Sequence, residues 1–393
     1  MTLSVLRSTM HSPLSVAMNV APMMQPLTGI GRYVRELTRA LAVEPALQLQ
    51  GFDGRRWGPV QEVDVLPQAL QRNLRHWVRD HVPQAYPLHR ALMAWRFQQG
   101  VRRHKPALYH EPNFLALPFD GPIVITVHDL SWIRHPETHP PMRVRQLGRH
   151  FQASLERADR IITDSQFVKD ELIGVFGTPA GRIVPIGLGA EADCLPRSAA
   201  QTRPALSALG LQHGQYLLAL GTLEPRKNPK TLLRAYAALP APLRERYPLV
   251  WVGMPGWGDD VLPEARALEA SGHLRWTGYL SRARVLDVLA GARLLAYPSL
   301  YEGFGLPVLE AMQAGVPVLT SNVSSLPEVA GDAAVLVDPL DPVALREGLQ
   351  ALLEDERLRA QCITLGLARS QAFGWDRTAR QTLDVYRSVL GRD

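Results

Sequence analysis

The sequence predicts an α/β protein made of two domains with parallel sheets. The chain has 393 residues, which is too long for one ordinary domain. Short apolar runs alternate along it with amphipathic stretches of helical length, as in parallel strands covered by helices. A segment rich in alanine, glycine and proline at 187–204 predicts the linker between the two halves.

The first half begins with a predicted strand at 14–20, followed by Gly29 and Gly31 at the start of a helix. A glycine loop at a helix start is typical of a phosphate-binding turn. Asp53 lies about 20 residues further on, as the acid of a dinucleotide fingerprint would. Val34 occupies the position of the third glycine of that fingerprint, so an NAD(P)-dependent enzyme stays open as an alternative.

The other elements of the first half lead to a histidine. His128 follows the predicted strand 121–127, at the carboxyl end of a parallel strand, where ligands bind in open α/β sheets. Asp129 either orients the His128 ring or caps the next segment. Further strands are predicted at 107–110, 160–164 and 182–186, and helices at 143–158 and 166–176.

The segment 69–105 is basic and aromatic, with Asp80 as its single acid. Two interpretations are open. The segment either packs its aromatic side chains into the domain with its arginines in water, or lies on an anionic bilayer surface. The orientation of Trp77 and Trp95 distinguishes the two interpretations.

In the second half, a predicted strand at 216–220 runs into a loop that contains Thr222, Arg226 and Lys227. Adjacent cations after a strand are well placed to hold a diphosphate. Two cations can also stabilise the charge that develops on a departing nucleoside diphosphate without a metal ion. The sequence has no Asp-x-Asp metal motif, so we expect no metal and no cofactor.

The stretch from Tyr301 to Glu310 carries the strongest site signal. It connects an apolar strand at 292–298 to a helix that begins at Pro307. Glu302 and Glu310 flank this turn, and carboxylates are natural partners of sugar hydroxyls. The alternative is an ordinary strand-to-helix turn with two exposed acids. The backbone N–H groups placed to bind an anion belong to Gly303, Phe304, Gly305 and Leu306.

Composition narrows the classes of protein. The apolar content of 46% and charged content of 20% are globular values. The net charge of +6 is compatible with an anionic substrate or membrane, whereas no nucleic-acid-binding motif occurs, so nucleic acid is not an expected partner. Cys194 and Cys362 offer no pairing framework, and no apolar run approaches the roughly 20 residues of a membrane span. Residues 1–24 lack the apolar core of a signal peptide, so we expect a cytoplasmic protein.

Three motifs together resemble a known family. They are 221–228 (Gly-Thr-Leu-Glu-Pro-Arg-Lys-Asn), the Glu302-x7-Glu310 spacing after Tyr297-Pro-Ser-Leu-Tyr, and the segment 321–332. In combination they are similar to the retaining glycosyltransferases of family 4, which have the GT-B fold. The similar branch comprises the mannosyl- and rhamnosyltransferases of O-antigen and related bacterial polysaccharides, and the resemblance runs from about Leu14 to the C-terminus.

The resemblance implies two Rossmann-like domains that face a central cleft. We expect an acceptor-side domain at 1–190, a nucleotide-sugar-binding domain at 205–375, and a C-terminal helix at 376–393 that crosses back to the first domain. The implied catalytic residues are His128, Glu302, Arg226 and Lys227. The implied donor-binding residues add Gly29, Gly31, Thr222, Tyr279, Leu280, the 303–306 turn and Glu310.

The resemblance also implies the reaction. The expected donor is GDP-mannose, with GDP- or dTDP-rhamnose as alternatives, and the expected acceptor is a growing, polyprenyl-diphosphate-linked glycan. A lipid-linked acceptor is compatible with the interpretation in which 69–105 contacts the cytoplasmic face of the inner membrane, and the interpretation in which this segment packs into the domain stays open. Many family members carry an arginine where this chain has Thr222, so more is expected to depend on Arg226 and Lys227. A non-catalytic sugar-nucleotide-binding protein is the remaining alternative.

Overall fold

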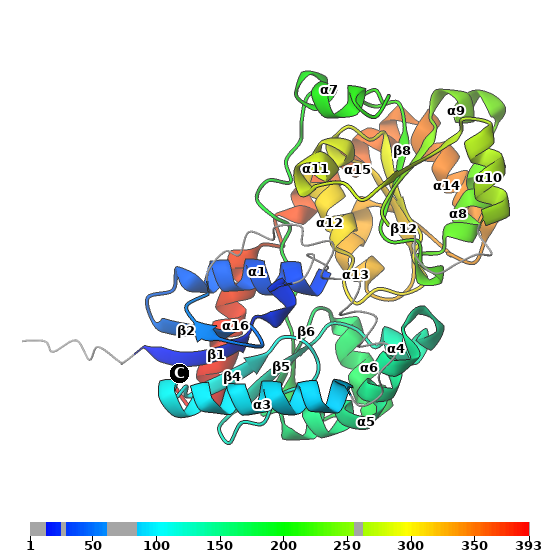
Figure 1. Ribbon diagram of the computed structural model, residues 1–393. Coiled ribbons are helices and arrows are strands. Elements are labelled where there is room, and N and C mark those ends of the chain that lie inside the picture. Colours follow the sequence, from blue (N-terminus) through cyan, green and yellow to red (C-terminus); the bar gives the residue numbers. More distant parts are fainter. Residues whose placement is uncertain (1–12, 25–28, 61–84, 255–261, 393) are drawn as a thin grey trace, which may run out of the picture. The chain divides into compact units, whose positions relative to one another are not determined.

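The computed structural model describes residues 13–24, 29–60, 85–254 and 262–392. The chain forms two compact units (Figure 1). The first contains 1–127, 150–162 and 379–393, and the second contains 128–149 and 163–378. The predicted domain boundaries at 190, 205 and 375 stay predictions.

A seven-stranded sheet has the order β3-β2-β1-β4-β5-β6-β7. β1 pairs in parallel with β2 and β4, β4 pairs in parallel with β5, and β3 is antiparallel to β2. The strands are β1 (Leu14–Asn19), β2 (Leu47–Phe52), β3 (Trp57–Gly58), β4 (Leu108–Glu111), β5 (Ile123–Val127), β6 (Arg160–Thr163) and β7 (Ile183–Pro185).

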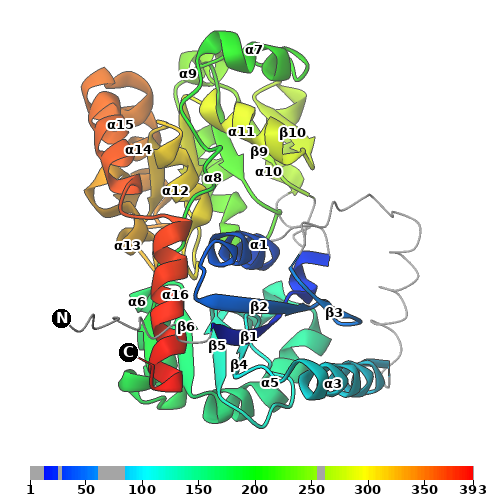
Figure 2. The ribbon, with the colours of Figure 1, turned by 90° about the vertical axis from the view of Figure 1, so that its left-hand side faces the viewer.

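The helices of this half follow the strands in the order expected of an α/β fold. They are η1 (Ala21–Met24), α1 (Gly29–Ala42), α3 (Ala85–His104), α4 (Ser131–Arg134), η2 (Pro136–Thr138), α5 (Pro141–Arg157), α6 (Gln166–Phe176) and η3 (Ala180–Arg182). Ser165 caps α6, because its side chain accepts a hydrogen bond from the Val168 N–H. Phe97 of α3 packs against Phe52 and Tyr109, which places α3 beside the sheet (Figure 2).

A six-stranded sheet in the second unit has the order β10-β9-β8-β11-β12-β13. All its strand pairs are parallel. The strands are β8 (Leu217–Leu220), β9 (Leu249–Val252), β10 (Leu274–Gly278), β11 (Leu294–Tyr297), β12 (Val318–Ser321) and β13 (Val335–Val337). The chain proceeds from β8 to one side and from β11 to the other, so their carboxyl ends form a topological switch point, where α/β sheets bind ligands.

Helices flank this second sheet, with α11 and α12 on one side and α8, α10 and α14 on the other (Figure 1). The helices of the second half of the chain are α7 (Ala199–Ser207), η4 (Pro225–Lys227), α8 (Pro229–Ala237), α9 (Ala241–Arg246), α10 (Leu262–Ala270), α11 (Arg282–Ala290), α12 (Leu306–Gln313), α13 (Leu326–Ala330), η6 (Gly331–Ala333), α14 (Pro342–Glu354), α15 (Glu356–Ser370) and α16 (Trp375–Leu390), and most of α16 belongs to the first unit.

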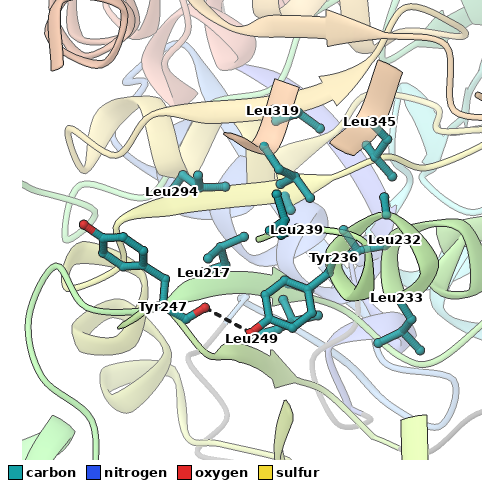
Figure 3. Packing of buried hydrophobic residues seen from close by; sticks show 14 of the residues in the cluster. Leu217, Leu232, Leu233, Tyr236, Leu239, Tyr247, Leu249, Leu294, Leu319 and Leu345 are labelled. Carbon is teal, nitrogen blue, oxygen red and sulfur yellow. Dashed lines mark hydrogen bonds between the residues drawn. The ribbon is translucent and has the colours of Figure 1, made fainter. Parts of the chain in front are cut away.

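The core of the second unit consists of side chains from the sheet packed against side chains from its helices. Leucines of four neighbouring strands meet Tyr236 of α8, whose hydroxyl donates to the Tyr247 carbonyl oxygen at 3.1 Å (Figure 3). Burying such apolar side chains stabilises the sheet by about 1.5–3 kcal/mol each. The four leucines are Leu217, Leu249, Leu294 and Leu319, all fully buried.

The prediction that the linker runs from 187 to 204 is wrong for its last residues, which are helical. Ser198 forms a capping box with Gln201, so α7 begins at Ala199 and carries Pro204 inside it. Residues 379–393 belong to the first unit, where the Tyr386 hydroxyl lies 2.6 Å from His110 Nδ1. None of the described helices combines the length and the apolar character needed to cross a bilayer.

Candidate active site

The loop after β8 brings two cations to the switch point. Pro225–Lys227 forms the short helix η4, and Asn228 follows in the left-handed region with φ 56°. The Asn228 amide donates to the Pro339 carbonyl at 2.6 Å, and the Leu300 N–H donates to the Arg226 carbonyl at 2.8 Å. The loop after β8 is thereby tied to the loop after β11, so Arg226 and Lys227 have fixed positions.

Glu302 lies between these cations. Arg226 Nη1 is 2.9 Å from Glu302 Oε2, and Lys227 Nζ is 2.6 Å from Glu302 Oε1. Arg226 also donates to the Tyr301 carbonyl at 2.8 Å and lies 3.4 Å from Glu224. The Glu302 side chain is 9% exposed, so this is a largely desolvated ion-pair network.

Burial and charge act in opposite directions on these groups. Burial raises the pKa of Glu302, but the charges of Lys227 and Arg226 outweigh it and hold that pKa at about 2. Burial lowers the pKa of Lys227, and Glu302 offsets part of this effect. Burial also lowers the pKa of Arg226, but Glu302, Asp129 and Glu224 together raise it above its usual value. Glu302 is therefore ionised at neutral pH.

The 303–306 turn is shaped by glycine and serine. Gly305 has φ 107°, a conformation that other residues rarely adopt, and it precedes α12. Ser325 donates to the carbonyls of Glu302 and Phe304 at 2.9 Å each. Within the described residues, α12 has no side-chain N-cap. Its second residue, Pro307, lacks an N–H, and the Val308 N–H donates to the Gly305 carbonyl at 2.9 Å, so Leu306 supplies the helical N–H nearest to the turn.

Glu310 lies one turn into α12 and is 2% exposed. Arg282, the first residue of α11, pairs with it at 3.0 Å, and also lies 3.5 Å from Glu191 and 3.7 Å from Asp193. The alternative of an ordinary turn with two exposed acids is therefore wrong, because both Glu302 and Glu310 are buried and ion-paired.

Tyr279 and Leu280 follow β10 at the carboxyl edge of the same sheet. Tyr279 is 71% exposed and Leu280 is buried. Thr222 follows β8 and is half-buried. The structure thus brings the predicted residues of the second half to one sheet edge, but their roles toward a nucleotide stay predictions.

His128 lies against the glycine turn. A Cβ added to Gly303 would collide with the His128 carbonyl oxygen, so only glycine allows this approach. His128 Nδ1 is 2.8 Å from Asp164 Oδ2. Asp129 instead accepts hydrogen bonds from the backbone and hydroxyl of Ser131 at 3.0 and 2.6 Å. Of the two alternatives for Asp129, the structure favours the second, since Asp164 bonds the His128 ring and Asp129 bonds the first residue of α4.

Gly29 and Gly31 begin α1 in the first unit. Residues 25–28 of the predicted loop lie outside the described residues. Asp53 accepts hydrogen bonds from the backbone N–H groups of Arg55 and Arg56 at 2.7 Å each. The structure thus gives Asp53 a role in a turn, and the donor role of Gly29 and Gly31 stays a prediction.

The basic segment 69–105 is described from residue 85 onward, so Trp77 lies outside the described residues. In α3, Trp95 is 61% exposed and Leu92 is 41% exposed, whereas Phe97 is fully buried. The interpretation that all the aromatic side chains pack inward is wrong for Trp95.

Several site residues were not predicted from the sequence. Tyr297 ends β11 and contacts both Lys227 and Glu302. The sequence marked it as part of the family motif and of an apolar run, but not as a site residue. Arg282 and Asp164 carried no local signal, because their partners are distant along the chain. No group of three metal-ligating side chains occurs in the described part of the chain, and metal independence stays a prediction.

Comparisons with known proteins identify the family. Residues 27–193 match the model described as Glycosyltransferase Family 4, and residues 209–367 match Glycosyl transferases group 1. The chain is 39% identical to the O-antigen chain mannosyltransferase B of Escherichia coli over 93% of this chain and 97% of that protein. The chain belongs to the family 4 glycosyltransferases. This glycosyltransferase is also 32% identical to the serotype-specific mannosyltransferase WbdA of Escherichia coli, over 68% of this chain and 33% of that protein.

The solved structures agree on the fold of the glycosyltransferase. A sucrose-phosphate synthase from Thermosynechococcus elongatus matches with a TM-score of 0.73 and 20% identity, over 98% of this chain and 100% of that chain. The predicted GT-B class, with two Rossmann-like domains, is confirmed. The protein is an enzyme that takes a nucleotide-sugar donor and a glycan acceptor.

Proposed function

We propose that this glycosyltransferase moves mannose from GDP-mannose onto a growing polysaccharide of the O-antigen type, with retention at the anomeric carbon. The main support for this proposal is the 39% identity with a relative named O-antigen chain mannosyltransferase B, across nearly all of both chains. Rhamnosyl transfer from GDP- or dTDP-rhamnose is the alternative, and no contact in the structure favours it.

The donor diphosphate is bound by Arg226, Lys227 and the N–H groups of residues 303–306. Support comes from their shared position at the β8–β11 switch point. Glu302 holds both cations in place and accepts from hydroxyls of the hexose. His128, whose carbonyl packs against Gly303, contacts the transferred sugar. Glu310, held by Arg282, accepts from the ribose hydroxyls, and Tyr279 and Leu280 contact the base.

The reaction is a front-face substitution. The acceptor hydroxyl attacks the anomeric carbon as the bond from that carbon to the GDP phosphate oxygen breaks. The leaving phosphate takes the acceptor proton, so no enzymic nucleophile is required. Arg226 and Lys227 stabilise the negative charge that grows on the diphosphate, a role that a metal ion fills in other enzymes.

The acceptor is a polyprenyl-diphosphate-linked glycan, and α3 contacts the anionic cytoplasmic face of the inner membrane. Trp95 and Leu92 are exposed on the same helix as the exposed Arg102 and Arg103, and this combination supports the membrane contact, since exposed apolar and basic side chains suit a bilayer interface. Sedimentation with anionic vesicles tests it. Trp95→Ala should weaken binding several-fold, whereas Val43→Ala, at another exposed apolar residue, should not; equal binding by both variants would refute the contact.

The experiment that tests the reaction is a thermal-shift panel of GDP, UDP, dTDP and their sugars, followed by transfer assays with the best donor. A ligand that binds the folded state raises the midpoint by mass action. We expect GDP and GDP-mannose to give the largest shifts, and mannose to be transferred. A preference for dTDP would support the rhamnosyl alternative, stabilisation by NAD would support the dehydrogenase alternative, and binding without turnover would indicate a sensor.

A further inference from the structure

We propose that Tyr297 is a positioning residue that fixes Lys227 against Glu302 at the donor site. This inference rests on the proposed function, in which Lys227 and Glu302 face the donor. Tyr297 contacts neither the diphosphate nor the sugar in this account, and acts only through the other two residues.

The three side chains form a closed triangle of hydrogen bonds. Lys227 Nζ donates to the Tyr297 hydroxyl at 2.5 Å and to Glu302 Oε1 at 2.6 Å. The Tyr297 hydroxyl donates in turn to Glu302 Oε1 at 2.9 Å. Each member is thus held by two others, which restricts both the ammonium and the carboxylate.

The tyrosine itself is held firmly. It is the last residue of β11 and pairs with Thr320 of β12, whose hydroxyl donates to the Tyr297 carbonyl at 2.8 Å. Its side chain is buried, and burial raises its pKa well above the usual value, so the hydroxyl keeps its proton at every physiological pH. The ring also lies 4.8 Å from Lys227 Nζ, within the range of a cation–π contact.

Lys227 has more need of such support than Arg226. The ammonium ends a flexible four-carbon stem, whereas the planar guanidinium of Arg226 is also fixed by the Tyr301 carbonyl and by Glu224. Lys227 Nζ donates to Tyr297 and to Glu302, so removal of the Tyr297 hydroxyl would leave it only the bond to Glu302 of these two. A cation displaced by about 1 Å can cost on the order of 100-fold in rate.

The structure supplies a matched control. Tyr216 lies immediately before β8 in the same unit, is fully buried, and its hydroxyl donates to the Val288 carbonyl at 2.5 Å. Tyr216→Phe and Tyr297→Phe therefore both remove one buried hydroxyl, but only Tyr297→Phe changes the triangle. If the Tyr297 hydroxyl were merely structural, both variants would have a lower melting temperature, and both would keep the kcat of the wild type.

The test measures transfer kinetics and calorimetric GDP affinity for wild type, Tyr297→Phe and Tyr216→Phe. We expect Tyr297→Phe to lower kcat roughly 10- to 100-fold with a much smaller change in donor KM, and Tyr216→Phe to retain wild-type kcat. An ammonium that loses a hydrogen-bond acceptor deprotonates more readily, so the alkaline limb of the pH–kcat profile should move to lower pH in Tyr297→Phe. The charged groups around Lys227, which are Glu302, Arg226 and Glu224, are the same in all three proteins.

The outcomes separate this inference from the function on which it rests. If wild type neither binds GDP nor transfers a sugar, the proposed function fails. If wild type is active but Tyr297→Phe keeps its kcat and alkaline limb, or matches Tyr216→Phe in both, the positioning role is overturned.

Discussion

At the residue scale, the site depends on pairs of opposite charges that are distant in sequence. Glu302 is held by Arg226 and Lys227, and Glu310 by Arg282. Both glutamates were recognisable from the sequence, because they flank a glycine turn at a helix start. Their partners were not all recognisable, since nothing local to Arg282 indicates that its guanidinium reaches α12.

The Arg282–Glu310 pair gives a prediction about nucleotide affinity. Arg282→Ala removes the cation that orients the Glu310 carboxylate, so GDP binding should weaken by roughly tenfold in calorimetry, and Arg282→Lys should fall between. Arg234→Ala, which removes a largely exposed partner of Glu264, is the control and should bind GDP as wild type does. Unchanged GDP affinity in Arg282→Ala, with the fold intact, would remove Arg282 from the account.

At the element scale, the order of the strands decides what the loops can build. The apolar runs predicted β8 and β11, but only the sheet order places their carboxyl ends side by side at a switch point. A sequence read in order cannot reveal this adjacency, because β9 and β10 intervene along the chain. Strands β2, β3 and β13 were not predicted, since none of them is marked by a long apolar run.

In the first unit, the carboxyl ends of the neighbouring parallel strands β1 and β4 also lie side by side. Asn19 ends β1 and donates to both carboxyl oxygens of Glu111, at 3.2 and 2.9 Å, and Glu111 ends β4. Burial raises the pKa of Glu111 from 4.5 to about 7, against hydrogen bonds from Tyr109 and Asn19 that lower it. The folded state therefore retains a proton between pH 4.5 and 7 that the unfolded state has lost.

This raised pKa predicts how stability depends on pH. The contribution of Glu111 to the free energy of unfolding is complete below about pH 4.5. It is lost as the pH rises through about 7, which lowers the free energy of unfolding by about 3 kcal/mol. Glu111→Gln removes the titration, so denaturant unfolding should show that its stability relative to wild type increases from pH 5 to pH 8. Glu156→Gln, on the exposed face of α5, should follow wild type at both pH values. A constant difference between Glu111→Gln and wild type would contradict the raised pKa.

At the scale of the whole molecule, the chain contains two Rossmann-like sheets. The fold class was predictable because apolar strands, glycine loops and helices recur in a regular order along the chain. The linker boundary was harder to predict, since Ala199–Ser207 has the composition of a linker but begins with a capping box. The glycine turn, the cation pair and the family resemblance together predicted a glycosyltransferase, which the comparisons confirm.

We propose above all that ionised Glu302 organises Arg226 and Lys227 around the donor. The most direct measurement is the rate of mannose transfer by Glu302→Gln, beside Glu264→Gln, whose carboxylate pairs with Arg234 on the surface. We expect a loss of at least about 100-fold for Glu302→Gln with a folded protein, and little change for Glu264→Gln. Wild-type transfer by purified Glu302→Gln would contradict it.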